Sequence, residues 1–273
     1  MTPLELLHEV EGLPRFDLPD ELASLYPGTL GFEEPRLFAN FVATADGVVA
    51  IPSIPQSNRL IAAGSAADRF VMGLLRACAD VVVVGSGTLL ASPGGLWTPA
   101  QAYPDVAEGF AELRRRLGRP PEVEAAVLTA SGSLDPAHPV FQRGGLVLTT
   151  DEGAAFLAGR LPEGQVLALG PGPFLDVAAA VGRLRARGHR LILSEGGPRV
   201  FGSLLAAGLV DELFLTVSPL LTGRLVGDER LALVEDADLL PGGPPELRVL
   251  GARREGDHLF LRYGLDRSSG SSA

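Results

Sequence analysis

Two glycine-rich segments have the residue types and spacing needed to hold a phosphate group. Val81–Val84 leads into Gly85-Ser86-Gly87-Thr88, and Leu191–Glu195 leads into Gly196-Gly197-Pro198-Arg199-Val200. Glycine lets a backbone approach a pyrophosphate closely, and a helix N-terminus offers free N–H donors. Each turn alone is compatible with an ordinary strand-to-helix connection. The two together, each after an apolar run, favour nucleotide binding.

The first turn does not fit a Rossmann dinucleotide site. Leu90 stands where the third glycine of that motif belongs. No strand ending in an acidic residue follows within the next ~20–30 residues, where the ribose hydroxyls would be bound. The sequence therefore predicts nucleotide binding on a different α/β scaffold.

Two carboxylates stand at positions suited to catalysis. Glu195 precedes the Gly196-Gly197 pair at a strand end, where burial would suit it to handling a proton. Its alternative role is to order this turn by accepting backbone hydrogen bonds. Asp46, followed by Gly47, belongs to a tight turn and either stabilises that turn or acts in catalysis.

Composition excludes several other chemistries. The net charge of −10 argues against nucleic acid as a partner, and all 23 basic residues are arginine, which rules out lysine-based catalysis. No metal site is expected, because Cys78 is the only cysteine and the four histidines are widely spaced. No apolar run reaches the roughly 18–20 residues of a membrane span, and Met1–Glu11 lacks a basic signal region, so we expect a cytoplasmic protein.

The elements that would position these residues alternate between strands and helices. This alternation predicts an α/β fold with a mainly parallel sheet covered on both faces, and Glu255-Gly256-Asp257 predicts a C-terminal antiparallel hairpin. The expected helices are Ala66–Ala77, Phe110–Leu117, Glu152–Ala158 with Asp151 as N-cap, Phe174–Arg187 and Arg199–Ala207. We expect an N-terminal extension with one short helix over residues 1–34, a single domain over 35–267, and a disordered tail over 268–273.

Five sequence blocks in a fixed order resemble the pyrimidine reductase family of riboflavin biosynthesis. The blocks are Ala39–Gly47, Asp68–Arg76, Val84–Thr88, Ser194–Pro198 and Val210–Pro219. This resemblance implies a dihydrofolate-reductase-like three-layer fold. It also implies NADPH as cofactor and hydride transfer to a C=N carbon of a (phospho)ribosylamino-pyrimidine. A homodimer is implied as well, with Leu213–Val217 as a plausible interface.

The resemblance also implies roles for individual residues. Gly85–Thr88 and Gly196–Val200 would close on the cofactor's phosphates and ribose, and Thr129 and Ser131 would meet its adenosine end. Ser131 and Arg199 are the candidates for a 2′-phosphate. The candidates for substrate binding are Asn40, Thr44, Ser57 and Arg59.

One segment departs from the family pattern. Leu89–Trp97 lacks the acidic residues and the arginine that grip a phosphoribosyl group, and it offers Trp97 for stacking on a flat heterocycle. This departure leaves two alternatives open. One is a pterin or dihydrofolate reductase on the same scaffold, and the other is a non-catalytic NADPH-binding protein.

Overall fold

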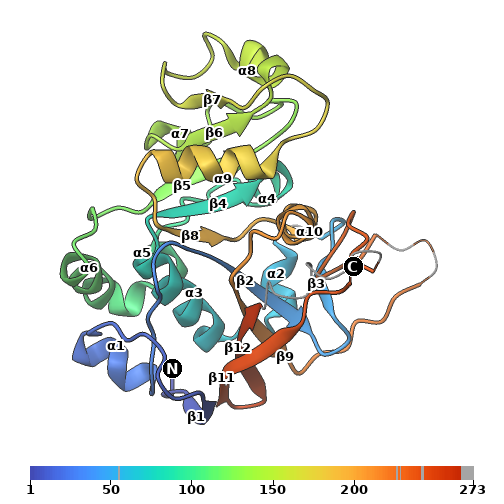
Figure 1. The fold of residues 1–273 in the computed structure, drawn as a ribbon. Coiled ribbons are helices and arrows are strands. Elements are labelled where there is room, and N and C mark those ends of the chain that lie inside the picture. Colours follow the sequence, from blue (N-terminus) through green and yellow to red (C-terminus); the bar gives the residue numbers. More distant parts are fainter. Residues whose placement is uncertain (55, 226, 228, 241–242, 266–273) are drawn as a thin grey trace.

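A long mixed β-sheet runs through the whole molecule (Figure 1). The computed structural model describes residues 1–54, 56–225, 227, 229–240 and 243–265. Within these residues the sheet has ten strands. In spatial order they are β1 (Glu5–Glu9), β11 (Leu247–Glu255), β12 (His258–Leu265), β9 (Glu212–Ser218), β2 (Arg36–Thr44), β8 (Leu191–Ser194), β4 (Val81–Gly85), β5 (Glu124–Leu128), β6 (Leu146–Thr149) and β7 (Val166–Ala168).

The strands from β9 to β7 pair in parallel, and β12, β11 and β1 continue the sheet as antiparallel strands. The last two strands of the chain form the predicted hairpin. A small antiparallel ribbon joins β3 (Val48–Ala50) to β10 (Leu231–Ala232). The predicted fold class, a mainly parallel mixed sheet with a C-terminal antiparallel hairpin, is confirmed.

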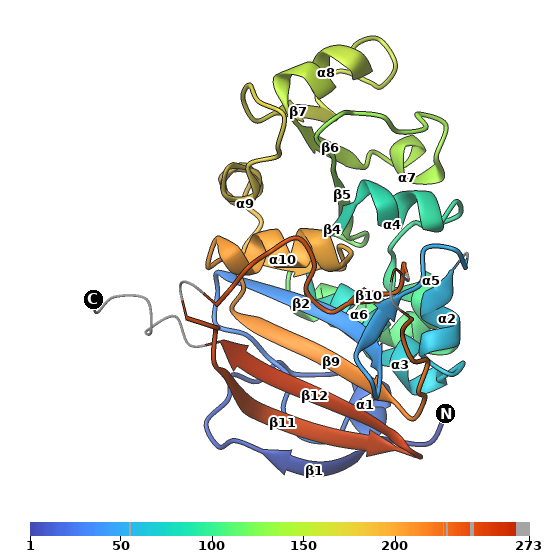
Figure 2. The same ribbon diagram turned by 90° about the vertical axis from the view of Figure 1, so that its right-hand side faces the viewer.

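Helices cover both faces of the sheet (Figure 2). The helices are α1 (Asp20–Leu25), α2 (Ser57–Ile61), α3 (Ala66–Cys78), α4 (Ser86–Ala91), α5 (Pro99–Ala102), the 3-10 turn η1 (Pro104–Val106), α6 (Ala107–Arg116), α7 (Pro139–Gln142), α8 (Asp151–Leu157), α9 (Val177–Ala186) and α10 (Pro198–Ala206). The core on one face includes α1, α3 and α6, and the core on the other includes α9 and α10. Among the described residues no helix is long and apolar enough to cross a membrane.

The first 34 residues contain more structure than the sequence suggested. The expected short helix is α1, but Glu5–Glu9 also adds an edge strand to the main sheet. Ion pairs accompany this pairing, because Glu5 contacts Arg254 and Glu9 contacts Arg253. Long-range pairing rather than a local apolar pattern makes this segment a strand. The tail expected over 268–273 lies outside the described residues.

Several helix starts differ from the predictions, including that of α6, which begins at Ala107 rather than Phe110. Side-chain caps account for two others. Thr150, not Asp151, caps α8, since its side chain accepts a hydrogen bond from the Gly153 N–H at 3.1 Å. The helix expected from Phe174 begins at Val177, where the Asp176 side chain accepts from the Ala179 N–H at 2.9 Å. In both cases a side-chain cap decides where the helix begins.

Leu213–Val217, named above as a plausible dimer interface, stays a prediction, and a partner would meet its side chains rather than its backbone. It belongs to β9, which is hydrogen-bonded to β12 on one side and to β2 on the other. This central position leaves no backbone groups free for a partner. Parallel pairing also brings the carboxyl ends of β2, β8, β4 and β5 to one edge, where open α/β sheets bind ligands.

Candidate functional site

The two glycine turns meet at this carboxyl edge. Strands β4 and β8 pair in parallel, so the turns after Val83 and Ser194 lie side by side. Val200 of α10 packs against both turns. A methyl group on Gly85 would lie 2.9 Å from Val200 Cγ2, and one on Gly196 would lie 2.6 Å from Val200 Cγ1. Glycine is therefore required at both positions by close packing across the junction.

Gly87 and Gly197 face less crowded space. A methyl group on Gly87 would meet nothing within 4 Å, and one on Gly197 would meet only Thr88 Oγ1, at 3.6 Å. The first N–H groups of α4 and α10 have no intrahelical partners, which is general for helix starts. The structure thus joins the turns at Val200 and leaves open space and free donors on their outer side.

The turn after β5 lies beside them, because β4 and β5 pair in parallel with Gly85 opposite Leu128. Thr129 is buried, and its hydroxyl accepts a hydrogen bond from the Gly132 N–H at 3.2 Å. Ser131 is exposed. Thr129 therefore shapes this turn, and Ser131 is the hydroxyl that faces outward.

Arg199, the other candidate for a 2′-phosphate, is paired with an acidic side chain. Its Nε lies 3.0 Å from Asp236 Oδ2, and both side chains are about 70% exposed. An exposed ion pair of this kind is weak. A bound anion would compete with Asp236 for the guanidinium.

A buried ion pair holds Glu195. Arg76 of α3 donates from Nε and Nη2 to the two carboxylate oxygens, at 2.9 and 2.6 Å. Its third nitrogen donates to the Thr98 carbonyl at 3.2 Å, and the side chains of Arg76 and Glu195 are 7% and 9% exposed. The sequence left open whether Glu195 handles a proton or orders the glycine turn. A bidentate guanidinium contact favours the ordering role, although the partner is Arg76 rather than the backbone.

Asp46 also has mainly structural contacts. Its carboxylate accepts hydrogen bonds from the Thr44 hydroxyl at 2.5 Å and from the Gly223 N–H at 2.6 Å. These bonds, that of Thr44 foremost, lower the pKa of Asp46 to about 2. At neutral pH Asp46 is therefore a carboxylate that ties the β2–β3 turn to residues 222–223, and it holds no proton to donate.

The four candidates for substrate binding lie in different settings. Asn40 is half-buried on β2, whereas Thr44 is buried and donates to Asp46. Ser57 begins α2, and its hydroxyl accepts from the Ile51 N–H at 3.0 Å. Arg59 is exposed on the same helix. Asn40 and Arg59 are thus the two whose polar groups are not engaged in the contacts that shape the local backbone.

Trp97 is not available for stacking on a heterocycle. Its side chain is 4% exposed, and its ring stacks on His138 with the centroids 6.0 Å apart. The Gln101 side chain accepts from the Leu96 and Trp97 N–H groups, which closes the loop. The expectation from the sequence was wrong because the indole ring is buried against His138, a residue distant in the sequence.

Sequence reasoning missed a buried carboxyl group beside this site. Asp68 of α3 is 4% exposed, and this burial raises its pKa to about 6. The available signal was that Asp68 lies three residues before Val71 and so on the apolar face of the helix.

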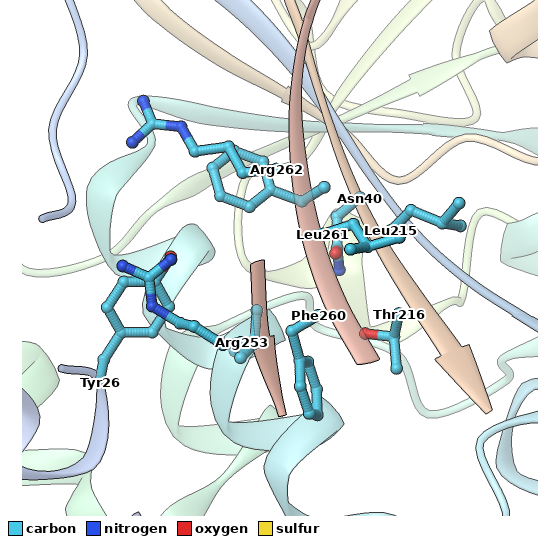
Figure 3. Close-up of a pocket in the computed structure, with 10 residues that line it drawn as sticks. Tyr26, Asn40, Leu215, Thr216, Arg253, Phe260, Leu261 and Arg262 are labelled. Atoms are coloured by element: carbon cyan, nitrogen blue, oxygen red, sulfur yellow. The ribbon is translucent and has the colours of Figure 1, made fainter. Parts of the chain in front are cut away.

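A small cavity lies between α3 and the sheet (Figure 3). Asn40 and Thr216, on the neighbouring strands β2 and β9, both line it. Val71 of α3 and Arg262 of β12 line other parts of its wall. The substrate candidate Asn40 and the Thr216 side chain therefore border the same small space.

Most of the chain matches the profile of a known protein family. The profile described as "RibD C-terminal domain" matches residues 35–253. The chain belongs to this family. The match confirms the resemblance to the reductases of riboflavin biosynthesis, and no curated protein matches the chain.

Solved structures share the fold at low sequence identity. A pyrimidine reductase-like protein of Corynebacterium diphtheriae is 22% identical, with a TM-score of 0.66, over 86% of this chain and 93% of that one. RibD of Acinetobacter baumannii is 19% identical, with a TM-score of 0.63, over 86% of this chain and 59% of that one. The reductase Rib7 of Saccharomyces cerevisiae is 15% identical, with a TM-score of 0.52, over 88% and 93%.

The buried ion pair of this RibD-family chain gives a first prediction. Arg76→Met leaves Glu195 buried without its partner, so we expect the free energy of unfolding to fall by about 3–5 kcal/mol. Arg254→Met breaks the exposed pair with Glu5, whose side chains are 51% and 57% exposed, and should cost less than about 1 kcal/mol. Urea denaturation at pH 7 measures both. Equal losses would contradict a special role for the Arg76–Glu195 pair.

The glycine junction gives a second prediction. Gly85→Ala places a methyl group against Val200 Cγ2 and should cost about 1–3 kcal/mol of unfolding free energy. In the double variant Gly85→Ala/Val200→Ala the contact is absent, so a double-mutant cycle should show coupling between the two sites. Gly87→Ala, which meets nothing, is the control and should leave stability unchanged or slightly raised. A Gly85→Ala variant as stable as this control would contradict the packing argument.

Proposed function

We propose that this chain is an NADPH-dependent reductase that reduces a C=N bond of a (phospho)ribosylamino-pyrimidine, as in riboflavin biosynthesis. The observation that carries the proposal is the junction of two glycine turns at the carboxyl edge of the sheet, with Val200 packed against both. The family match supports the same reaction class.

The residues at this edge suit a dinucleotide. Gly85–Thr88 and Gly196–Val200 would hold the phosphates and ribose through N–H groups and the Thr88 hydroxyl, and the open space beside Gly87 admits a ligand. Ser131 and Arg199 would meet the 2′-phosphate, with Arg199 released from Asp236. Bound there, NADPH would supply the hydride for an electrophilic carbon.

The protein's own groups position the reactants. Arg76 and Glu195 fix the approach to the second glycine turn from inside the molecule. Asn40 offers an amide that can both donate and accept hydrogen bonds to a heterocycle. Asp46 holds residues 222–223 against the end of β2 and limits how far that loop can move.

The substrate could instead be a pterin or dihydrofolate. The observation that favours this alternative is the segment after α4, where Ser92–Trp97 forms a closed turn without an acidic or basic side chain to grip a phosphate. Burial of Trp97 removes the other argument for a pterin. The ribosylamino-pyrimidine therefore remains the preferred substrate.

We also propose a homodimer formed through one face of the antiparallel strands. In β12, Phe260 and Arg262 point into the core, which leaves Leu259 and Leu261 on the opposite face. Leu259 is 38% exposed, and Val249 of the neighbouring β11 is 39% exposed. Apolar side chains gathered on a sheet face are typical of a surface that a partner covers.

The proposed reaction is tested by following NADPH oxidation with the phosphoribosylamino-uracil and with dihydrofolate in parallel. We expect oxidation with the first substrate only, because the family match and the Asn40 side of the cavity favour a ribosylamino-pyrimidine. Oxidation with dihydrofolate only would assign the chain to pterin chemistry. Binding of NADPH without any oxidation would support the non-catalytic alternative.

Gly87→Val tests whether NADPH binds at the first glycine turn. Its side chain would occupy the space beside the first turn, where a methyl group on Gly87 meets nothing within 4 Å. We therefore expect NADPH affinity, measured by calorimetry, to fall at least tenfold while the unfolding midpoint stays within error. Unchanged affinity would place the cofactor elsewhere.

The dimer is tested by light scattering after size exclusion. Leu259→Glu puts a charge on the uncovered face and should convert a dimer into a monomer. Phe174→Glu changes a side chain that is 85% exposed in the loop before α9 and should leave the dimer intact. A monomeric wild-type protein, or a Leu259→Glu dimer, would contradict this interface.

A further inference from the structure

His138 joins two segments that belong to different parts of the proposed cofactor site. The residue is buried, with 6% of its surface exposed. Its Nδ1 atom accepts a hydrogen bond from the Val140 N–H at 3.2 Å and so caps the short helix α7. A neutral imidazole that accepts at Nδ1 carries its hydrogen on Nε2. The Nε2–H group therefore donates to the Ser92 carbonyl, 3.0 Å away.

The two segments follow neighbouring strands of the sheet. Ser92 ends α4, the helix that begins at the first glycine turn. His138 ends the connection from β5 to α7, which starts with Thr129 and contains Ser131. Because β4 and β5 pair in parallel, both segments leave the same carboxyl edge. The hydrogen bond from His138 to Ser92 thus links the segment after the proposed phosphate turn to the connection that carries the candidates for the adenosine end.

Aromatic contacts fix the orientation of the His138 ring. The Trp97 indole stacks on it with the ring centroids 6.0 Å apart, and Phe141 meets it edge-on at 6.2 Å. These contacts restrict rotation of the imidazole, so its Nε2–H group stays directed at the Ser92 carbonyl.

The backbone at Trp97 is strained. Its φ angle is 54°, in the left-handed region that is unfavourable for a bulky residue. The indole is also closely packed, since a methyl group on Gly95 would lie 2.6 Å from it. Such strain persists only where surrounding contacts compensate for it, and it is concentrated at functional sites. The stack on His138 and the hydrogen bonds to Gln101 are the compensating contacts here.

The connection after β5 is anchored near its start by close backbone packing. A methyl group on Gly132 would lie 2.4 Å from the Gly153 carbonyl oxygen of α8. His138 anchors the far end of the same connection on Ser92. The segment next to Ser131 is therefore fixed on α8, and its distance from the end of α4 depends on His138.

We propose that His138 is a positioning residue for the cofactor, which holds the segment after the first glycine turn and the connection after β5 in the arrangement that a bound dinucleotide needs. This inference rests on the proposed function. A site that is already ordered does not have to be ordered by its ligand, so the ligand binds more tightly. The bond from His138 to Ser92 should therefore raise the affinity for NADPH. It should not change the rate of the chemical step, because it acts on the phosphate and adenosine parts of the cofactor.

This role also accounts for the segment that departs from the family pattern. Leu89–Trp97 has no charged side chain with which to grip a phosphate. Its Ser92 carbonyl and its Trp97 ring are instead the contact surface for His138. The segment thus serves the cofactor site by being held in place.

Two substitutions of His138 separate its two hydrogen bonds. Asparagine ends near the position of Nδ1 and is a favoured N-cap, so His138→Asn keeps an acceptor for the Val140 N–H and loses the bond to Ser92. Glutamine reaches about as far as Nε2, so His138→Gln keeps an N–H donor for Ser92 and loses the cap. Both variants lose the ring that stacks on Trp97, so this loss cancels when the two are compared.

The main test measures NADPH affinity by calorimetry in the full chain. We expect His138→Asn to bind NADPH about three- to tenfold more weakly than His138→Gln, the range that one hydrogen bond is worth. Each variant loses one hydrogen bond and the same stack, so their unfolding free energies in urea should be similar. With the phosphoribosylamino-uracil as substrate, the difference should appear in the KM for NADPH and not in kcat. A merely structural His138 would give two variants of equal affinity.

Amide hydrogen exchange gives a readout that needs no turnover. The Gly95 N–H donates to the Ser92 carbonyl at 2.8 Å, and the Leu96 N–H donates to the Gln101 side chain at 2.7 Å. Without NADPH these two amides should exchange faster in His138→Asn than in His138→Gln, and NADPH should slow them in both variants. If NADPH binds and leaves their exchange unchanged, the segment does not belong to the cofactor site and the positioning role is overturned.

The outcomes separate the inference from the function on which it rests. Equal NADPH affinities of the two variants, beside a wild-type protein that reduces the pyrimidine, would overturn the role of His138 alone. A wild-type protein that does not bind NADPH would overturn the proposed function and, with it, His138 as a positioning residue for the cofactor.

Discussion

The ion pair between Arg76 and Glu195 is the interaction on which the arrangement of the site depends. It joins the last turn of α3 to the residue that precedes the second glycine turn, and its third hydrogen bond reaches the Thr98 carbonyl. Three segments far apart in the sequence are thus held at one buried point. An ion pair inside a protein is not efficient as a source of stability, because both charges lose their hydration. Its value here is geometric, since a guanidinium fork accepts only one orientation of a carboxylate.

The negative charge of Glu195 also acts on a second buried carboxyl group, that of Asp68. Both oxygens of Glu195 accept from Arg76, and its negative charge adds to the effect of burial in raising the pKa of Asp68. Burial is the main cause of the raised pKa of Asp68, and the charge of His258 opposes it at least as much as that of Glu195 adds to it. The Arg76–Glu195 pair therefore orders the approach to the second glycine turn, and its charge has a secondary effect on Asp68.

Local sequence patterns predicted the elements of the fold well and the contacts between them poorly. Valine and leucine runs before glycine turns identify parallel strands such as Val81–Val84, because buried strands need apolar residues on both faces. The edge strand Glu5–Glu9 was missed, since its conformation comes from pairing with β11. The ion pair spans 119 positions, and nothing local in one sequence reports such a distance. Trp97 was misjudged for the same reason, because its partner His138 lies in another loop.

The two sides of the site follow different rules, and this explains why the cofactor is easier to assign than the substrate. The cofactor side is built from backbone and glycine at the junction around Val200, so its requirements are visible in residue type alone. The substrate side is built from side chains on separate elements, including Asn40 of β2 and Thr216 of β9. There, recognition depends on which polar groups remain free after the core has formed. Trp97 is taken up by packing and Thr44 by its bond to Asp46, whereas Asn40 lines a small cavity. If Asn40 binds the substrate as proposed, its amide selects a heterocycle that both accepts and donates hydrogen bonds.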